Sequence, residues 1–224
     1  MAEYRAFDRP AALPERASQV RVKVSLSKQL AYVLEGDSPL LIMPVSVGKA
    51  ESPAPTGNFR ILSKQHKRRA YSHGYLYPRE MTPPITAEWV KIKELPEEKL
   101  PEDHIFIGTP MSYWCEFADG YGFHTGWVKP YPCSTGCVRM HENVAPKFFR
   151  IVRKGTPVNI AHHQPEDNTI GIDIPRSPNA DPLPGYPQSL KMSDQIFYNH
   201  KPATFAPWYN ITPPEEKKKR FYFF

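Results

Sequence analysis

Residues 122–160 read GFHTGWVKPYPCSTGCVRMHENVAPKFFRIVRKGTPVNI, and they place a histidine, His124, thirteen positions before a cysteine, Cys137. A cysteine thiol needs a base to become a thiolate, and a histidine held beside it can be that base. Gly136, just before the cysteine, lets the backbone turn tightly and aim amide N–H groups at a developing oxyanion. Arg139 can neutralise a carboxylate on a substrate. Together these are the parts of an acyl-transfer enzyme.

The residues after the cysteine predict one short helix and a closing strand. Within 142–154, apolar residues recur at helical spacing, at Val144, Phe148, Ile151 and Val152. Pro146 falls in the first turn, where proline is tolerated, and Gly155 is a plausible stop. Residues 155–160 then form the last strand, and we expect the helix to brace the cysteine loop.

The chain upstream predicts strands joined by tight turns. Residues 20–26, VRVKVSL, alternate apolar and polar side chains, which is typical of a half-buried strand. Turn signals such as Pro-Ala-Pro-Thr-Gly separate the next apolar runs. Further strands are expected at 30–36, 40–48, 58–62 and 105–108. Hairpin-linked strands before any helix indicate an antiparallel β core.

The central stretch resembles the active-site motif of the L,D-transpeptidases, the ErfK/YkuD family of bacterial cell-wall enzymes. That motif is a histidine, a loop, Ser/Thr-His-Gly-Cys, an apolar residue and Arg or Asn. The matching positions are His124, Ser134, Gly136, Cys137, Val138 and Arg139. Thr135 departs from the motif, because it stands where a second histidine is usual. An upstream run of Ser-Lys-Gln-Leu, Pro-Val-Ser-Val-Gly and Pro-Thr-Gly-Asn-Phe-Arg-Ile also resembles the opening of these catalytic domains, so the likeness covers 20–161.

This resemblance implies a mainly β fold, an L,D-transpeptidase-like β-sandwich with one short helix after the catalytic cysteine and a Pro-rich C-terminal extension. It divides the chain into an N-terminal arm, 1–18, a catalytic domain, 19–161, and the extension, 162–224. The extension is expected to wrap the domain or to stay mobile, with Trp208, Tyr209 and Ile211 as possible anchors.

The implied activity is that of a cysteine acyltransferase that forms a thioester with peptidoglycan stem peptides, as donor and as acceptor, without a cofactor or a metal. Cys137 is the expected nucleophile and His124 its base, and the backbone carbonyl of Thr125 holds the imidazole. The amides of Gly136 and Cys137, together with that of Thr135, form the oxyanion hole. The expected substrate-binding residues are Arg139, Ser134, Tyr113, Trp114 and Trp127.

Several alternatives stay open at this point. Capture of the thioester by water instead of an amine makes the same site an L,D-carboxypeptidase, a hydrolase. Thr135 is compatible with a non-catalytic wall-binding relative. Tyr113 and Trp114 could be core packing, and Arg139 could make a structural ion pair. A papain-like peptidase is excluded, because there the cysteine precedes the histidine.

Composition and charge restrict the binding partners and the cellular location that the sequence predicts. The net charge of +6 and pI of about 9.1 suit either an anionic cell wall or simple solubility, and no nucleic-acid-binding motif is present. No apolar run is long enough for a transmembrane helix. The substrate predicts an exported, periplasmic or wall-associated protein with a role in cell-wall biogenesis and cell shape, although residues 1–19 carry no secretory signal. Cys115 and Cys133 can pair or stay as thiols, their spacing is not that of a zinc site, and the oligomeric state is open.

Residues 63–104 have a weaker pattern. The basic run 64–69 is interpreted as a solvated loop, 72–84 as a loop rich in Tyr, Gly and Pro, and 87–93 as a weakly alternating segment. We expect this region to be an insertion beside the active site that forms part of the substrate wall.

Overall fold

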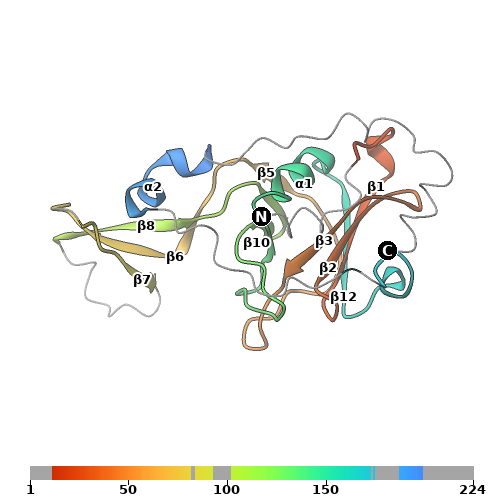
Figure 1. Ribbon diagram of the computed structural model, residues 1–224, viewed down its shortest axis with the longest axis horizontal. Helices are drawn as coiled ribbons and strands as arrows, with labels where there is room; N and C mark the ends of the chain where they lie inside the picture. Colours follow the sequence, from red (N-terminus) through yellow and green to blue (C-terminus); the bar gives the residue numbers. More distant parts are fainter. Residues whose placement is uncertain (1–11, 82–83, 93–101, 173, 175–186, 199–224) are drawn as a thin grey trace.

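The structure, a computed structural model, describes residues 12–81, 84–92, 102–172, 174 and 187–198 of the chain. Figure 1 shows an elongated molecule with a β-sandwich at one end and a three-stranded sheet at the other. Within these residues, no helix is both long and apolar enough to cross a bilayer.

A nine-stranded sheet, folded on itself, makes the sandwich. Its strand order is β4-β12-β1-β2-β3-β11-β10-β9-β5. The bounds are β1 Val20–Ser25, β2 Leu30–Glu35, β3 Ser38–Ser46, β4 Gly57–Arg60, β5 Ser63–Gln65, β9 Trp114–Ala118, β10 Tyr121–Thr125, β11 Val138–Met140 and β12 Pro157–Ala161. The long strand β3 pairs with β2 over 38–44 and with β11 at 45–46, so it belongs to both layers.

The predicted strands 20–26, 30–36, 40–48 and 58–62 are confirmed as β1 to β4, and β1, β2 and β3 pair antiparallel as expected. Two pairings differ from the antiparallel expectation. β12 pairs parallel with β1, and β11 pairs parallel with β10. Parallel neighbours need a crossover rather than a hairpin, and residues 126–137, which include Cys137, form the crossover from β10 to β11. The predicted helix, α1 Ala145–Ile151, lies between β11 and β12.

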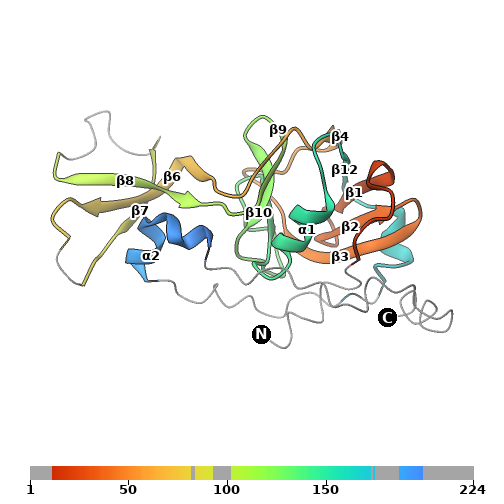
Figure 2. The ribbon, with the colours of Figure 1, turned by 90° about the horizontal axis from the view of Figure 1, so that it is seen from above.

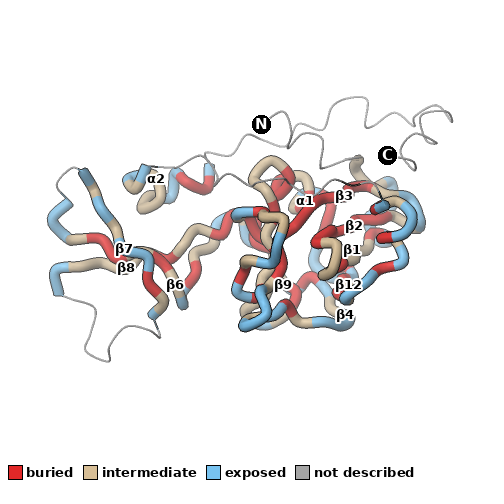
Figure 3. Tube along the Cα trace, turned by 60° about the horizontal axis from the view of Figure 1, so that its bottom comes forward, coloured by how far each residue is buried: buried red, intermediate tan, exposed pale blue. Residues whose placement is uncertain are grey.

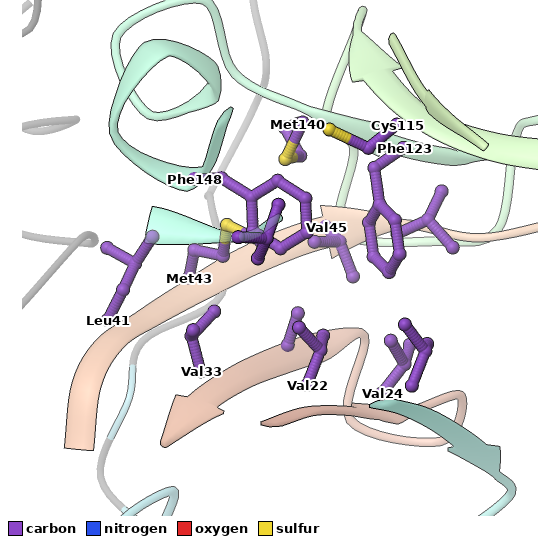
Figure 4. Close-up of a cluster of buried hydrophobic side chains, with 14 of the residues drawn as sticks. Val22, Val24, Val33, Leu41, Met43, Val45, Cys115, Phe123, Met140 and Phe148 are labelled. Atoms are coloured by element: carbon purple, nitrogen blue, oxygen red, sulfur yellow. The ribbon is translucent and has the colours of Figure 1, made fainter. Parts of the chain in front are cut away.

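The core lies between the two layers. In Figure 4, Val22, Val24 and Val33 on one layer face Phe123 and Met140 on the other, with Phe148 of α1 packed among them. The Phe123 and Phe148 rings lie 4.7 Å apart between centroids. Figure 3 shows that buried residues are concentrated in this sandwich. The apolar face of α1 therefore closes the core directly after the cysteine loop.

The second sheet has the order β7-β6-β8, with β6 Arg69–Pro78, β7 Glu88–Lys91 and β8 His104–Pro110. Strand β8 contains the predicted strand 105–108. The interpretation of 72–84 as a loop is wrong for its first part, because β6 extends to Pro78. Its Tyr side chains favour a strand once a partner is available, and that partner, β8, comes from about thirty residues downstream.

The basic run 64–69 is not a solvated loop either. Lys64 lies in β5, and its ammonium group donates to the carbonyls of Phe149 and Val152 at 2.5 and 2.6 Å, at the C-terminal end of α1. Arg69 begins β6 and donates to Lys191 and Ser193 carbonyls at 3.0 and 2.9 Å. Cations that satisfy the last carbonyls of a helix stabilise it, so these side chains hold elements together.

Two parts of the C-terminal extension are described. The 3-10 turn η4, Pro165–Asn168, buries Asp167, which accepts hydrogen bonds from Tyr32 and Ser25, each at 2.8 Å. Helix α2, Gln188–Met192, and the turn η5, Asp194–Phe197, lie along the three-stranded sheet (Figure 2). Trp208, Tyr209 and Ile211 lie outside the described residues, and the division of the chain at residues 18 and 161 stays a prediction.

Candidate active site

Two neighbouring parallel strands carry the predicted base and nucleophile. Phe123 of β10 lies opposite Val138 of β11, and His124 lies opposite Arg139. Continuing this register by one residue puts Cys137 opposite Gly122. Side chains alternate between the faces of a sheet, so Cys137 and His124 lie on one face as diagonal neighbours.

The imidazole of His124 is held in one tautomer. Its Nδ1–H donates to the backbone carbonyl of Thr125, with 2.6 Å between the two atoms, which leaves Nε2 as a proton acceptor. Burial, together with the charge of Arg139, lowers the pKa of His124 to about 3, against the opposing effect of the Thr125 carbonyl. The imidazole is therefore neutral near pH 7.

The thiol of Cys137 is also neutral at rest. It donates to the Gly120 carbonyl across 3.8 Å. Burial raises its pKa above the ordinary value, and the Gly122 amide and the charges of Arg139 and Arg68 act in the opposite direction. Among the described residues no hydrogen bond joins this thiol to His124, and such bonds are often loose before a substrate is bound.

The loop before the cysteine is shaped by a glycine and a serine. Gly136 has φ of +112°, and a Cβ on it would lie 2.5 Å from the ring of Tyr121. The buried hydroxyl of Ser134 donates to the Cys137 carbonyl at 2.5 Å and accepts from the Gly136 amide at 3.1 Å. Ser134 is itself held by the carbonyl of Val47. The Gly136 amide is thus already engaged, although it was expected in the oxyanion hole.

Three further predicted residues lie in or beside this loop. Thr135 is exposed at its tip. Arg139 lies 3.8 Å from the sulfur of Cys133 and makes no ion pair with a carboxylate among the described residues. Trp127 is 45% exposed, and its carbonyl is 3.8 Å from the same sulfur. All three could meet a substrate, and the ion-pair alternative for Arg139 has no support.

Tyr113 and Trp114 are both buried, which agrees with the core-packing alternative for Tyr113. Its ring packs edge-on against His66 at 4.7 Å and near Phe149 at 5.6 Å. Trp114 instead packs beside Cys137 and His124. Its indole is 2.8 Å from where a Cβ on Gly122 would be, so that glycine is what admits the ring.

The indole of Trp114 connects the site to residues that no sequence motif indicates. Its centroid is 5.9 Å from that of His124, and it packs in a small cluster with Ala70, Met111 and Cys137. The guanidinium of Arg68 lies over the same indole at 4.4 Å. The sequence signal that could have indicated Arg68 is the basic run 64–69. The side chains of this run have different environments, so the run alone does not single out Arg68.

Neither the other two cysteines nor the hollow described below provides a second candidate active site. All three cysteines are free thiols, so Cys115 and Cys133 do not pair, and burial raises the pKa of Cys115 to about 12. A hollow of about 700 Å³ beside β1, β4 and β12 includes none of the predicted site residues. Across the described ranges, no group of three or more His, Cys, Asp or Glu side chains is suited to hold a metal ion.

Comparison with known proteins identifies the family to which the sequence belongs. The sequence matches the YkuD family model, described as the L,D-transpeptidase catalytic domain, over residues 19–160. No curated protein matches the chain.

Solved structures similar to the chain include L,D-transpeptidases of three bacteria. That of Stackebrandtia nassauensis is 18% identical, with a TM-score of 0.47, and the match covers 70% of this chain and 60% of that one. An enzyme from Mycobacterium smegmatis is 18% identical (TM-score 0.46, 64% and 58% covered), and L,D-transpeptidase 1 of Mycobacterium tuberculosis is 20% identical (TM-score 0.44, 63% and 60% covered). The match thus spans about 60% of the length of these structures.

The family match includes more than half of the 224 residues and contains His124, Gly136, Cys137 and Arg139. This chain belongs to the YkuD family of L,D-transpeptidase catalytic domains.

Proposed function

We propose that the protein is a cysteine-dependent L,D-transpeptidase that acts on peptidoglycan stem peptides through a thioester. The observation that carries this proposal is the 2.6 Å hydrogen bond from His124 Nδ1 to the Thr125 carbonyl, beside the strand that follows Cys137. This bond fixes Nε2 as the proton acceptor on the face that also bears the thiol. A backbone carbonyl here has the orienting role that a carboxylate has in serine triads.

In the proposed reaction, the donor peptide binds and the thiol turns from the Gly120 carbonyl toward His124. Its proton passes to Nε2 as the sulfur attacks the carbonyl between an L-centre and a D-centre residue. The carbon–sulfur bond forms, the carbon–nitrogen bond to the terminal D-residue breaks, and the proton on Nε2 goes to the departing amine. Charge thus develops only during the attack, positive on the imidazole and negative on the carbonyl oxygen of the donor.

The tetrahedral intermediate needs amide donors near Cys137. Because the Gly136 amide already donates to Ser134, we assign the oxyanion hole to the amides of Cys137 and Thr135. The positive φ of Gly136 turns the backbone between them. In this assignment Thr135 acts through its backbone, so the absence of a histidine side chain removes no donor.

The second half-reaction decides the product. An amine from an acceptor stem peptide gives a cross-link, whereas water gives a shortened peptide and L,D-carboxypeptidase activity. Both outcomes use the same thioester and the same base, so this alternative stays with the proposal. A non-catalytic wall-binding role is less well supported, because the held imidazole and the free thiol have no use in it. With this substrate the protein would act outside the cytoplasmic membrane, in the periplasm or at the wall, where its net charge of +6 favours an anionic polymer.

Intact-protein mass spectrometry after incubation with imipenem, followed by peptide mapping, tests the nucleophile. We expect one adduct, on Cys137, and none in Cys137→Ser. Cys115→Ser and Cys133→Ser are matched controls that should keep the adduct. A synthetic tetrapeptide donor then tests the reaction, with release of its terminal D-residue and a thioester on the same cysteine. Absence of both products, or labelling of another cysteine, would refute the proposal.

A further inference from the structure

The surroundings of the thiol contain a second cation with no assigned use. We propose that Arg68 is a substrate-binding residue that holds a free carboxylate of the acyl donor and so selects acidic donors over amidated ones. This inference rests on the proposed function and deepens it, since it concerns which stem peptides the site accepts.

Position is the first argument. Arg68 directly precedes β6, and its guanidinium carbon lies 4.4 Å from the centre of the Trp114 indole. The same indole packs with Cys137 and lies 5.9 Å from the His124 ring. Arg68 and the two reacting groups therefore share one aromatic platform. Stacking on an aromatic ring also presets the plane of a guanidinium, which reduces the entropy lost on binding.

The second argument is the absence of a partner. The Nε atom of Arg68 is buried and has no hydrogen-bond partner, and its guanidinium makes no ion pair or hydrogen bond with any described residue. The other cations of the run are occupied. Lys64 donates to two carbonyls of α1, Lys67 pairs with Asp194 at 3.2 Å, and Arg69 donates to carbonyls of β8 and α2. A buried donor that lacks a partner is costly, which points to a ligand as its acceptor.

The third argument is local charge. Arg139, like Arg68, has no carboxylate partner among the described residues, and both cations act electrostatically on Cys137 and on His124. Two guanidinium groups near one thiol favour an anionic substrate. Peptide donors provide such anions as carboxylates, which the planar guanidinium fork binds through two parallel hydrogen bonds. A donor with two carboxylates near the scissile bond could satisfy both arginines.

The test compares three synthetic tetrapeptide donors with wild type, Arg68→Gln and Arg68→Lys. One donor has both carboxylates free, one has the terminal carboxylate amidated, and one has the side-chain carboxylate next to the scissile bond amidated. The measured quantity is kcat/KM for thioester formation on Cys137, followed by rapid-quench mass spectrometry. Arg60→Gln is the matched control, because Arg60 lies on β4 and donates only to the Gly155 carbonyl.

We expect Arg68→Gln to lower kcat/KM for the diacid about tenfold to a hundredfold, the effect of losing a hydrogen bond to a charged group. For one of the two amidated donors the same substitution should change kcat/KM by less than about threefold, as at an uninvolved position. Arg68→Lys should restore part of the preference, since it keeps the charge but not the fork. Arg60→Gln should behave as wild type with all three donors.

Equal losses with every donor would overturn the proposal, because Arg68 would then only support Trp114. No loss with any donor would overturn it as well. Thermal melting and the rate of Cys137 alkylation by uncharged iodoacetamide identify a variant that is merely misfolded. Calorimetric binding of the three donors to Cys137→Ala, with and without Arg68→Gln, measures the carboxylate preference without turnover. A preference there that depends on Arg68 supports the inference even if wild type forms no thioester, an outcome that would sink the proposed function alone.

Discussion

At the scale of single residues, burial decides the protonation of the candidate catalytic pair. It lowers the pKa of His124 to about 3 and raises the pKa of the Cys137 thiol. Both shifts favour the uncharged form of the side chain. The charge of the nearby Arg139 lowers both pKa values, so it adds to the shift of His124 and opposes that of Cys137. The pair therefore rests as thiol and imidazole, and the base must act during the attack rather than before it.

This resting state predicts the pH dependence of acylation. His124 accepts a proton only when neutral, and with a pKa of about 3 it stays neutral well below pH 7. Lowering the pH from about 8 to about 5 should therefore leave kcat/KM for thioester formation almost unchanged, with no acid limb near the ordinary imidazole pKa of about 6.5. The profile is to be measured on one donor in constant ionic strength. A bell-shaped curve with its acid limb between about 6 and 7 would contradict a neutral pair.

Substitutions at positions 124 and 135 separate the base from the atypical motif position. His124→Ala removes the proton acceptor and should slow acylation by about 10²–10⁴-fold, as loss of a general base does. Thr135→His adds an imidazole at an exposed loop tip and should change the rate by less than about tenfold, or about 1.4 kcal/mol of barrier. Both are measured as thioester formation on the same donor at one pH. A nearly silent His124→Ala, together with a large gain from Thr135→His, would show that the base is misassigned.

At the scale of elements, the loop before β11 is what brings the thiol to the histidine. At one end of this loop, the Ser134 amide donates to the Val47 carbonyl, and the Ser134 carbonyl accepts from the Lys49 amide. The loop then turns at Gly136 and leads into β11, which pairs parallel with β10. The helix α1 then closes the core behind it. The position of the proposed nucleophile, Cys137, therefore depends on both a local turn and distant strand pairing.

Gly136→Ala tests this turn. The new Cβ would meet the Tyr121 ring at 2.5 Å, in a backbone conformation with φ of +112° that L-residues rarely adopt. We expect a loss of stability of about 1–3 kcal/mol, as for other strained backbone positions, with a large loss of acylation. Gly155→Ala is the matched control, because Gly155 has φ of +88° but nothing within 4 Å of the new Cβ.

Thermal melting and mass spectrometry of the adduct measure the two effects in both variants. Gly155→Ala should lose some stability and keep its acylation rate. If Gly136→Ala acylates as fast as Gly155→Ala, the turn at Gly136 does not position the nucleophile.

At the scale of the whole molecule, the buried His124 and the half-buried His141 couple folding to pH. Burial lowers the pKa of His141 to about 4 and that of His124 to about 3, both below the value of 6.5 expected for an unfolded chain. Below pH 6.5 the unfolded state takes up protons that the folded state does not. The stability from these groups is present above that pH and is lost as the pH falls toward 3 to 4, where the folded histidines also protonate.

Urea unfolding at pH values from 7 to 4 checks this coupling. Each buried histidine should lower the free energy of unfolding by up to about 1.4 kcal/mol per pH unit below its unfolded pKa. His141→Gln should flatten the dependence by one proton, and His163, which is exposed, gives the matched control as His163→Gln. A free energy of unfolding that does not change over this range would contradict the burial of both imidazoles.

The parts of this protein whose signals are local could be predicted from the amino-acid sequence alone. Alternating side chains and turns define β1 to β4, and helical spacing with a well-placed proline defines α1. The motif around Cys137 indicated the family, and the expected bond from His124 to the Thr125 carbonyl joins adjacent residues. Such features depend on a few neighbouring residues and on the backbone preferences of those residues.

The remaining features depend on contacts between distant parts of the chain. Whether 69–78 is a loop or a strand depends on β8, and whether a basic side chain is solvated depends on which carbonyls reach it from elsewhere in the chain. Within one basic run, Lys64 and Arg69 meet helix ends, whereas Arg68 meets the indole beneath the thiol. Strand pairing and burial join residues far apart in sequence, so no local pattern could have distinguished these cations.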